Sequence, residues 1–138
     1  MNWTSYALIA IGIVGFSDIF RKLASGLKDP FFANLVFQIG SVTAAIVLYV
    51  LFSRKVQFDS KLMPFAFISG LLISTFTLFS FKTLSIGPGA STVIPVLRIG
   101  GIALVVLLGI FLLKEQFTIQ KFMGLALSFI GVYLLFSK

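Results

Sequence analysis

Side chains able to do acid–base or metal chemistry are scarce in this sequence of 138 residues. It contains no cysteine and no histidine, which excludes thiol catalysis, disulfides and imidazole acid–base chemistry. There are four acidic residues, and no two are close enough in sequence to suggest a paired-carboxylate site. They are Asp18, Asp29, Asp59 and Glu115. We therefore expect no enzyme activity, no metal site and no cofactor.

Two charged residues stand inside long apolar runs, Asp18 in the first and Arg98 in the fourth. A charge in such a setting is costly and commonly marks a pathway for a solute or an ion. One structural alternative is an ion pair between Asp18 and Arg98 that has no further role. Another is a local pairing on the surface of one helix, because Arg21 and Lys22 follow Asp18 by three and four residues.

The composition makes these charges exceptional. The apolar fraction is 59%, the mean hydropathy is +1.11, and 11% of the residues are charged. Soluble domains are about half apolar and about a quarter charged. A chain of this length has too little interior to hide so much apolar surface, so a water-soluble fold is excluded. The 17 phenylalanines exclude a disordered chain.

Five apolar runs must position the polar residues. Each run has about 18–24 residues, which as a helix crosses a hydrocarbon core of about 30 Å. The expected helices cover residues 3–23, 31–53, 62–81, 90–113 and 118–136. Because backbone in lipid must satisfy its own hydrogen bonds, the sequence predicts an all-α membrane protein, with a single five-helix bundle over residues 1–138. No basic residue precedes the first run, so we expect a span there and not a cleaved signal peptide.

Every predicted span brings a polar side chain to a similar depth. Counted from the side that holds the C-terminus, these side chains lie about 6–12 Å deep. The set is Asp18, Gln38, Ser74, Thr77, Arg98 and Ser128. We predict that the set, Ser128 apart, binds substrate. The structural alternatives are that Gln38 links helices and that the hydroxyls bond their own backbone.

The basic residues give a net charge of +7 but form no block or stripe, so we expect no nucleic-acid partner. Five lie on the side of the membrane that holds the N-terminus and five on the other side. The first five are Arg54, Lys55, Lys61, Lys114 and Lys121, and the others are Arg21, Lys22, Lys28, Lys82 and Lys138. This balance predicts dual topology. If Arg21 and Lys22 belong to the first helix and are discounted, a bias of five to three places the N-terminus inside.

The second half of the chain carries three short motifs. They are FKTLSIG at 81–87 with ASTVIPV at 90–96, LLKEQFT at 112–118, and QKFMG at 120–124 with GVYLL at 131–135. In this order they resemble the junction of the third and fourth helices, the next loop and the last helix of EamA-like repeats in the drug/metabolite transporter superfamily. The resemblance covers the whole chain as one five-helix repeat and is best over residues 78–137. The chain departs from the family pattern at Asp18 and Arg98, where uncharged residues are expected.

This resemblance implies a secondary transporter of small metabolites, with a site between helices near the midplane and alternating access. Full-length members join two such repeats in inverted orientation, so one repeat is half of a transporter and implies a homodimer. The balanced loop charge fits an antiparallel one. Arg98 favours anionic or zwitterionic solutes, such as amino acids. The expected partners are membrane lipids, the solute and a second copy, in the cytoplasmic membrane of a prokaryotic cell.

Two other functions stay open. A proton-coupled exporter of multidrug cations, similar to small multidrug resistance proteins, would use Asp18 to exchange protons for cations. Those proteins have four helices and a deep glutamate in the first, so the helix number and Arg98 argue against this function. The third class is a membrane subunit that transports nothing, which solute flux in liposomes separates from the other two.

Overall fold

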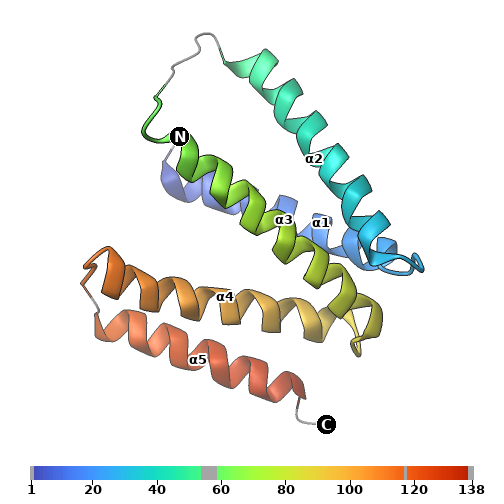
Figure 1. The fold of residues 1–138 in the computed structure, drawn as a ribbon. Helices are drawn as coiled ribbons and strands as arrows, with labels where there is room; N and C mark the ends of the chain where they lie inside the picture. Colours follow the sequence, from blue (N-terminus) through green and yellow to red (C-terminus); the bar gives the residue numbers. More distant parts are fainter. Residues whose placement is uncertain (1, 54–58, 117, 137–138) are drawn as a thin grey trace. The chain divides into compact units, whose positions relative to one another are not determined.

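The computed structural model describes residues 2–53, 59–116 and 118–136, the side chain of Phe136 excepted. Within these residues every regular element is an α-helix, and no strand occurs. Figure 1 shows the five helices of the described residues in chain order. They are α1 (Trp3–Ala24), α2 (Pro30–Phe52), α3 (Met63–Ile86), α4 (Ala90–Leu112) and α5 (Ile119–Phe136). The prediction of an all-α chain is confirmed.

Three helices in the described part of the chain are long and apolar enough to cross a membrane. Over 18 residues, the mean hydropathy reaches 2.2 in α2, 1.7 in α3 and 2.5 in α4. A helix of this length measures about 35 Å, slightly more than the hydrocarbon core. The apolar part of α5, Ile119–Leu135, is shorter, and α1 carries Asp18, Arg21 and Lys22 near its end. Length and composition thus indicate a membrane protein.

The connection between α1 and α2 is closed by local hydrogen bonds. The hydroxyl of Ser25 donates to the carbonyl of Lys22 at 2.6 Å, just beyond the end of α1. The carboxylate of Asp29 caps α2 by accepting from the N–H of Phe31 at 2.9 Å. Pro30 is the first residue of α2. A backbone N–H at this position makes no hydrogen bond within the helix, so proline, which lacks the N–H, is tolerated there. Both helix ends are therefore fixed by residues 22–31.

The third helix ends later than the sequence predicts. The expected span covers residues 62–81, whereas α3 extends over Met63–Ile86. The hydroxyls of Thr83 and Ser85 donate to carbonyls four and three residues earlier, at 2.8 and 2.7 Å. Because the helix itself supplies their hydrogen-bond partners, these polar residues can extend α3 without access to water. The helix ends only before the Gly-Pro-Gly turn at 87–89, because proline disfavours a helical residue before it.

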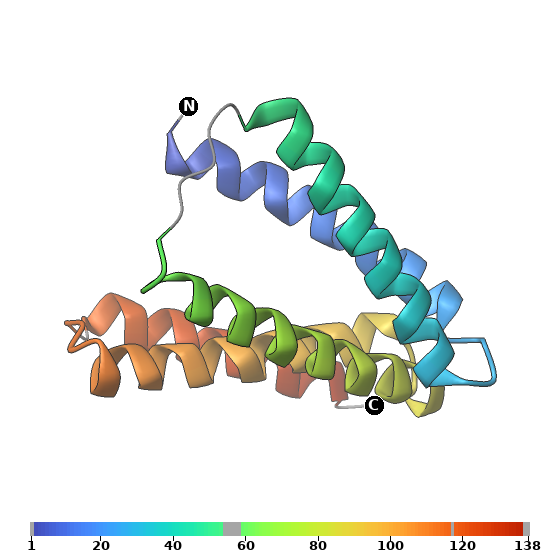
Figure 2. The ribbon, with the colours of Figure 1, turned by 45° about the horizontal axis from the view of Figure 1, so that its top comes forward.

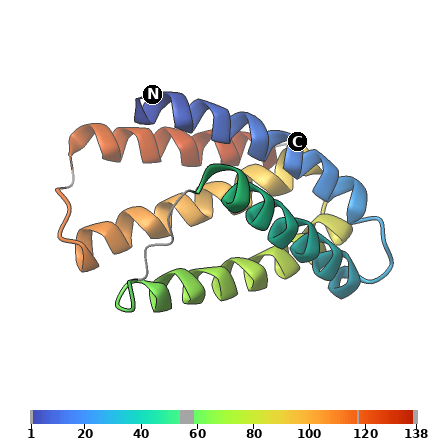
Figure 3. The same cartoon turned by 90° about the horizontal axis from the view of Figure 1, so that it is seen from above.

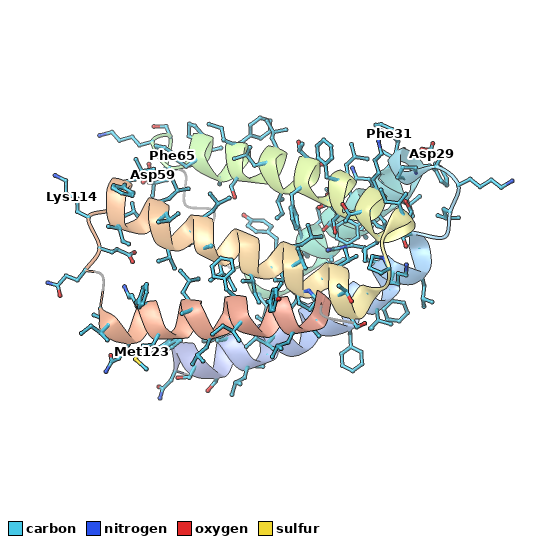
Figure 4. All side chains as sticks on the ribbon, turned by 90° about the horizontal axis from the view of Figure 1, so that it is seen from below. Asp29, Phe31, Asp59, Phe65, Lys114 and Met123 are labelled. Atoms are coloured by element: carbon cyan, nitrogen blue, oxygen red, sulfur yellow. The ribbon has the colours of Figure 1, made fainter. Side chains whose placement is uncertain are left out.

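Between α2 and α3, residues 54–58 lie outside the described residues. Three basic residues of the topology prediction, Arg54, Lys55 and Lys138, therefore lie outside the described residues. The described chain resumes at Asp59, whose carboxylate accepts from the N–H of Lys61 at 2.9 Å. Figure 4 labels Asp29 and Asp59 near the two ends of the first three helices. The turn that contains Asp29 and the turn that contains Asp59 therefore lie at opposite ends of α2.

The chain divides into two compact units, residues 1–86 and residues 87–138, and each is described by itself. In the first unit, α3 packs against both α1 and α2. Figures 2 and 3 show these helices converging where α1 ends, α2 begins and α3 ends, and diverging away from that end. The buried residues of this unit lie at this convergent end: Asp18, Ser25, Ala33, Thr77, Ser80, Phe81 and Leu84. A single domain over residues 1–138 stays a prediction.

In the second unit, α4 and α5 pack as an antiparallel pair (Figure 3). Lys114, whose side chain projects from the turn in Figure 4, has a left-handed φ of 54°. This conformation brings the N–H of Glu115 to the carbonyl of Gly109 at 3.0 Å and closes the end of α4. The hydroxyl of Thr118 then accepts from the N–H of Lys121 at 3.3 Å and begins α5.

Candidate functional site

A buried ion pair stands at the convergent end of the first unit. The Nη1 atom of Arg21 lies 3.1 Å from the Oδ1 atom of Asp18, one turn earlier on α1. The two side chains are 9% and 7% exposed, so the pair is buried and not a surface pairing. Taking two charges out of water costs several kcal/mol per ion. The attraction within the pair and further contacts of each charged group must offset this cost.

The guanidinium of Arg21 also lies over an aromatic ring. Its Cζ atom is 5.2 Å from the centre of the Phe37 ring on α2, within the range of a cation–π interaction. The ring of Phe37 in turn meets Phe81 of α3 edge to face, with centroids 5.9 Å apart and planes at 74°. One contact chain therefore joins Asp18 and Arg21 of α1 to α2 and α3.

A second cation ties α1 to α3. The ammonium of Lys22, half-buried, donates to the carbonyl of Leu84 at 2.7 Å. Leu84 is fully buried and lies in the last turn of α3. The basic pair that follows Asp18 is thus part of the site, with one cation turned to α2 and the other to α3.

Beside Arg21 lies a half-open pocket of about 190 Å³, lined by side chains from α1, α2 and α3. Its lining is apolar apart from Arg21 and Ser17. Phe37 and Phe81 contribute to the wall, and so do the small side chains of Ala24 and Ala33. An apolar pocket with one fixed charged group is the usual form of a small-molecule site.

Of the predicted site residues in this unit, Asp18 belongs to the ion pair, and Gln38 lies one turn beyond Asn34 on α2. The Nε2 atom of Gln38 and the Oδ1 atom of Asn34 are buried without a hydrogen-bond partner among the described residues. Ser74 is half-buried, and the buried Thr77 donates its hydroxyl to the carbonyl of Ile73 in its own helix. Gln38 can still meet a ligand or water, whereas the Thr77 hydroxyl is engaged by its backbone.

The other two members of the predicted polar layer lie in the second unit. Arg98 is half-buried in α4. The hydroxyl of Ser128 donates to the carbonyl of Gly124 at 2.8 Å, the structural alternative expected for it. The pairing of Arg98 with Asp18 or with a solute stays a prediction.

The turn between α4 and α5 holds a second ion pair. The Nζ atom of Lys121 lies 3.5 Å from the carboxylate of Glu115, and both side chains are about half exposed. The carboxylate lies over Gly109, where an added Cβ would meet Glu115 Oε2 at 3.3 Å. Exposed pairs of this kind contribute at most about 1 kcal/mol, so this one fixes the turn and is a weak site candidate.

The sequence prediction missed Arg21, Lys22 and the aromatic pair Phe37 and Phe81. The spacing of Asp18 and Arg21 was visible, but it predicts a surface contact as readily as a buried one. Phenylalanine is so frequent in this chain that no single ring stands out.

Apolar helices that enclose buried charges define the class: this is a helical membrane protein with a charged site at the convergent end of its first three helices. The chain belongs to the same family as the uncharacterized protein MJ1333.1 of Methanocaldococcus jannaschii. The two are 30% identical over 128 residues, which cover 93% of this chain and 90% of that protein. No family model matches the chain, and no solved structure matches it.

Proposed function

We propose that this chain is half of a secondary transporter, a five-span membrane protein that works as a dimer by alternating access and carries small anionic or zwitterionic metabolites. The observation that carries the proposal is the buried ion pair of Asp18 and Arg21 in a chain of apolar helices. Charges in such surroundings normally lie on the pathway of a solute or an ion. The resemblance of residues 78–137 to EamA-like repeats supports the same activity.

The lengths of the first and last helices support five spans. α1 has 22 residues and α5 has 18, which correspond to about 33 and 27 Å. Small mismatches to a core of about 30 Å are accommodated by tilt or local thinning. The charges of α1 lie in its last two turns, so the apolar residues before them can cross most of the membrane.

The dimer and its location rest on separate arguments. One five-helix repeat supplies one half of an inverted-repeat pathway, so a second copy must supply the other half. When Arg21 and Lys22, in the last turn of α1, are counted, five basic residues belong to each side, and this balance supports an antiparallel pair, because an unbiased chain inserts in both orientations. When the two are left out, the bias of five to three favours one orientation, with the N-terminus inside. The relative from Methanocaldococcus jannaschii supports the cytoplasmic membrane of a prokaryotic cell.

Arg98 supports the class of solute. A guanidinium within an apolar helix favours a carboxylate, either Asp18 or an acidic group of the solute, and repels a hydrophobic cation. A proton-coupled cation exporter that uses Asp18 is the second candidate. The 3.1 Å contact between Asp18 and Arg21 weighs against it, because a cationic substrate would have to displace Arg21.

The test is uptake by the purified full-length chain in liposomes, with labelled amino acids compared with labelled tetraphenylphosphonium. We expect amino-acid uptake that Arg98→Ala abolishes in a folded dimer, while Lys82→Ala, at an exposed position, leaves it unchanged. Preference for the cation, lost in Asp18→Asn, would establish the exporter instead. A reconstituted, folded protein with no flux of either solute would be a non-transporting subunit.

A further inference from the structure

We infer that the pocket beside Arg21 binds a small carboxylate that carries an apolar side chain of about the size of a benzene ring. The inference deepens the proposed function, on which it rests, by naming the class of substrate. The pocket lies wholly within the first unit and measures about 190 Å³. Pockets for drug-sized ligands measure about 300–1,000 Å³, so this one suits a solute of amino-acid size and not a bulky multidrug cation.

The shape of the pocket comes from a contrast of side-chain sizes. Ala24 of α1 and Ala33 of α2 line it and leave room, while Phe37 and Phe81 form an aromatic wall. Phe37 and Phe81 already meet edge to face, and a ligand ring beside them would extend the same arrangement. Aromatic contacts of this geometry contribute beyond the area that they bury, which favours a ring over a plain alkyl chain.

The charge of the pocket selects a carboxylate. Arg21 is the charged residue that lines it, and the ion pair with Asp18 holds the guanidinium in place. At the ends of α1 and α3 and in the turn before α2, basic residues outnumber acidic ones four to two. They are Arg21, Lys22, Lys28 and Lys82 against Asp18 and Asp29, of which Lys28, Lys82 and Asp29 are exposed. A carboxylate adds the missing negative charge, and the planar guanidinium is the group best suited to it. An organic cation would be repelled by the same surroundings.

The ligand test uses four probes that differ in one feature each. They are 3-phenylpropionate, L-phenylalanine, phenethylammonium and propionate. Binding is measured by equilibrium dialysis with the full-length chain in phosphatidylcholine nanodiscs. We expect 3-phenylpropionate and L-phenylalanine to bind at least tenfold more tightly than phenethylammonium, which lacks the carboxylate, and propionate, which lacks the ring. Equal binding of the ammonium or of propionate would overturn the inference.

A pocket-filling variant keeps every charge in place. Ala24→Leu fills the pocket and should weaken binding of 3-phenylpropionate at least tenfold, whereas Ala10→Leu, at an exposed position on the same helix, should leave it unchanged. Arg21→Gln alone leaves Asp18 buried without this partner, so the charge test uses the pair Arg21→Gln with Asp18→Asn. That pair should fold and lose binding. Full binding by Ala24→Leu, or by the folded pair, would contradict the site.

Acidic lipid headgroups are the other source of an anion at this end of the chain. Nanodiscs with one-fifth phosphatidylglycerol should leave binding of 3-phenylpropionate within twofold if the pocket takes a solute. Competitive loss in those nanodiscs, matched by retention of phosphatidylglycerol on the wild type and not on Ala24→Leu, would assign the pocket to lipid and overturn the inference.

Flux in liposomes then separates this inference from the proposed function. Selective binding without any flux would uphold the site and contradict transport. Flux that Arg98→Ala abolishes and Ala24→Leu leaves unchanged would uphold transport and overturn this pocket as its substrate site.

Discussion

The ammonium of Lys22 and the carbonyl of Leu84 make a hydrogen bond of 2.7 Å between the end of α1 and the end of α3. In an uninterrupted helix the Leu84 carbonyl would accept from the N–H four residues later. That residue is Pro88, which has no N–H. Lys22 therefore supplies the missing donor, and its charge lies at a helix C-terminus, where the helix dipole favours a cation.

Lys22→Met should lower the stability of the first unit. A hydrogen bond to a charged group contributes about 1.5–3 kcal/mol, and its loss leaves the buried Leu84 carbonyl without this donor. Thermal unfolding in detergent should show a lower midpoint for Lys22→Met than for the matched control Lys28→Met, at an exposed position. Adding Pro88→Ala to Lys22→Met restores a backbone N–H and should recover part of the loss. Equal midpoints for the two methionine variants would contradict this role of Lys22.

The Asp18–Arg21 pair should show strong coupling. Asp18→Asn or Arg21→Gln alone removes one partner of a pair whose side chains are under 10% exposed, and breaking such a pair costs about 3–5 kcal/mol. The double variant removes both charges and should be more stable than either single variant. A thermal double-mutant cycle measures this coupling. Additive losses would show that the two charges act independently.

The predicted contact between Arg98 and Asp18 is tested by a separate set of variants. If Arg98 is structural, Arg98→Ala should lower thermal stability. A variant that removes all three charges, Arg98→Gln with Asp18→Asn and Arg21→Gln, should restore it, because Asp18→Asn without Arg21→Gln would leave Arg21 without this partner. If Arg98 binds solute, Arg98→Ala should abolish uptake while the unfolding midpoint stays within about 1 °C of the wild type. The two outcomes separate a structural guanidinium from a solute-binding one.

The helices could be predicted because each depends on the composition and length of its own apolar run, which the sequence shows directly. An apolar run of about 20 residues has few other ways to satisfy its backbone in lipid. The end of α3 was placed too early because the sequence shows Lys82, Thr83 and Ser85 as polar, without showing that two hydroxyls return to their own helix. The Gly-Pro-Gly turn at 87–89 is the stronger signal, and it ends the helix.

The site could be predicted only in part. Asp18 stands out because an acid within an apolar run is rare, and that property can be read without a structure. The contact of Arg21 with Phe37, and of Phe37 with Phe81, depends on how three helices converge. Local spacing carries no information on that packing, so the sequence alone gives Arg21 only as a basic residue near one side of the membrane or as a local partner of Asp18.

The turn at Lys114 should be improved by glycine. A residue with a side chain and a φ of 54° has a steric cost of about 1 kcal/mol, which glycine avoids because it has no Cβ. Lys114→Gly should therefore be as stable as the wild type or more stable, by up to about 1 kcal/mol. Gln116→Gly, two residues later and without a positive φ, should be neutral or destabilising. A clear loss of stability in Lys114→Gly would show that its side chain supports the turn.

The proposed five-span topology places the turns at the two ends of α3 on opposite sides of the membrane. Reporter fusions at Asp59 and Gly87, which flank α3, should therefore give opposite responses in any one orientation. The same location for both fusions would exclude α3 as a span. This result is independent of which face of the membrane holds the N-terminus.

Dual topology adds a quantitative expectation to this design. With five basic residues on each side, Arg21 and Lys22 included, a C-terminal reporter should register on both faces of the membrane. Three lysines added within residues 87–89 should place that turn and the C-terminus inside, and three added within residues 114–116 should place them outside. These insertions carry equal charge and differ only in side, so each is the control of the other. A wild-type reporter on one face alone would instead support a fixed orientation, with Arg21 and Lys22 excluded from the loop charge.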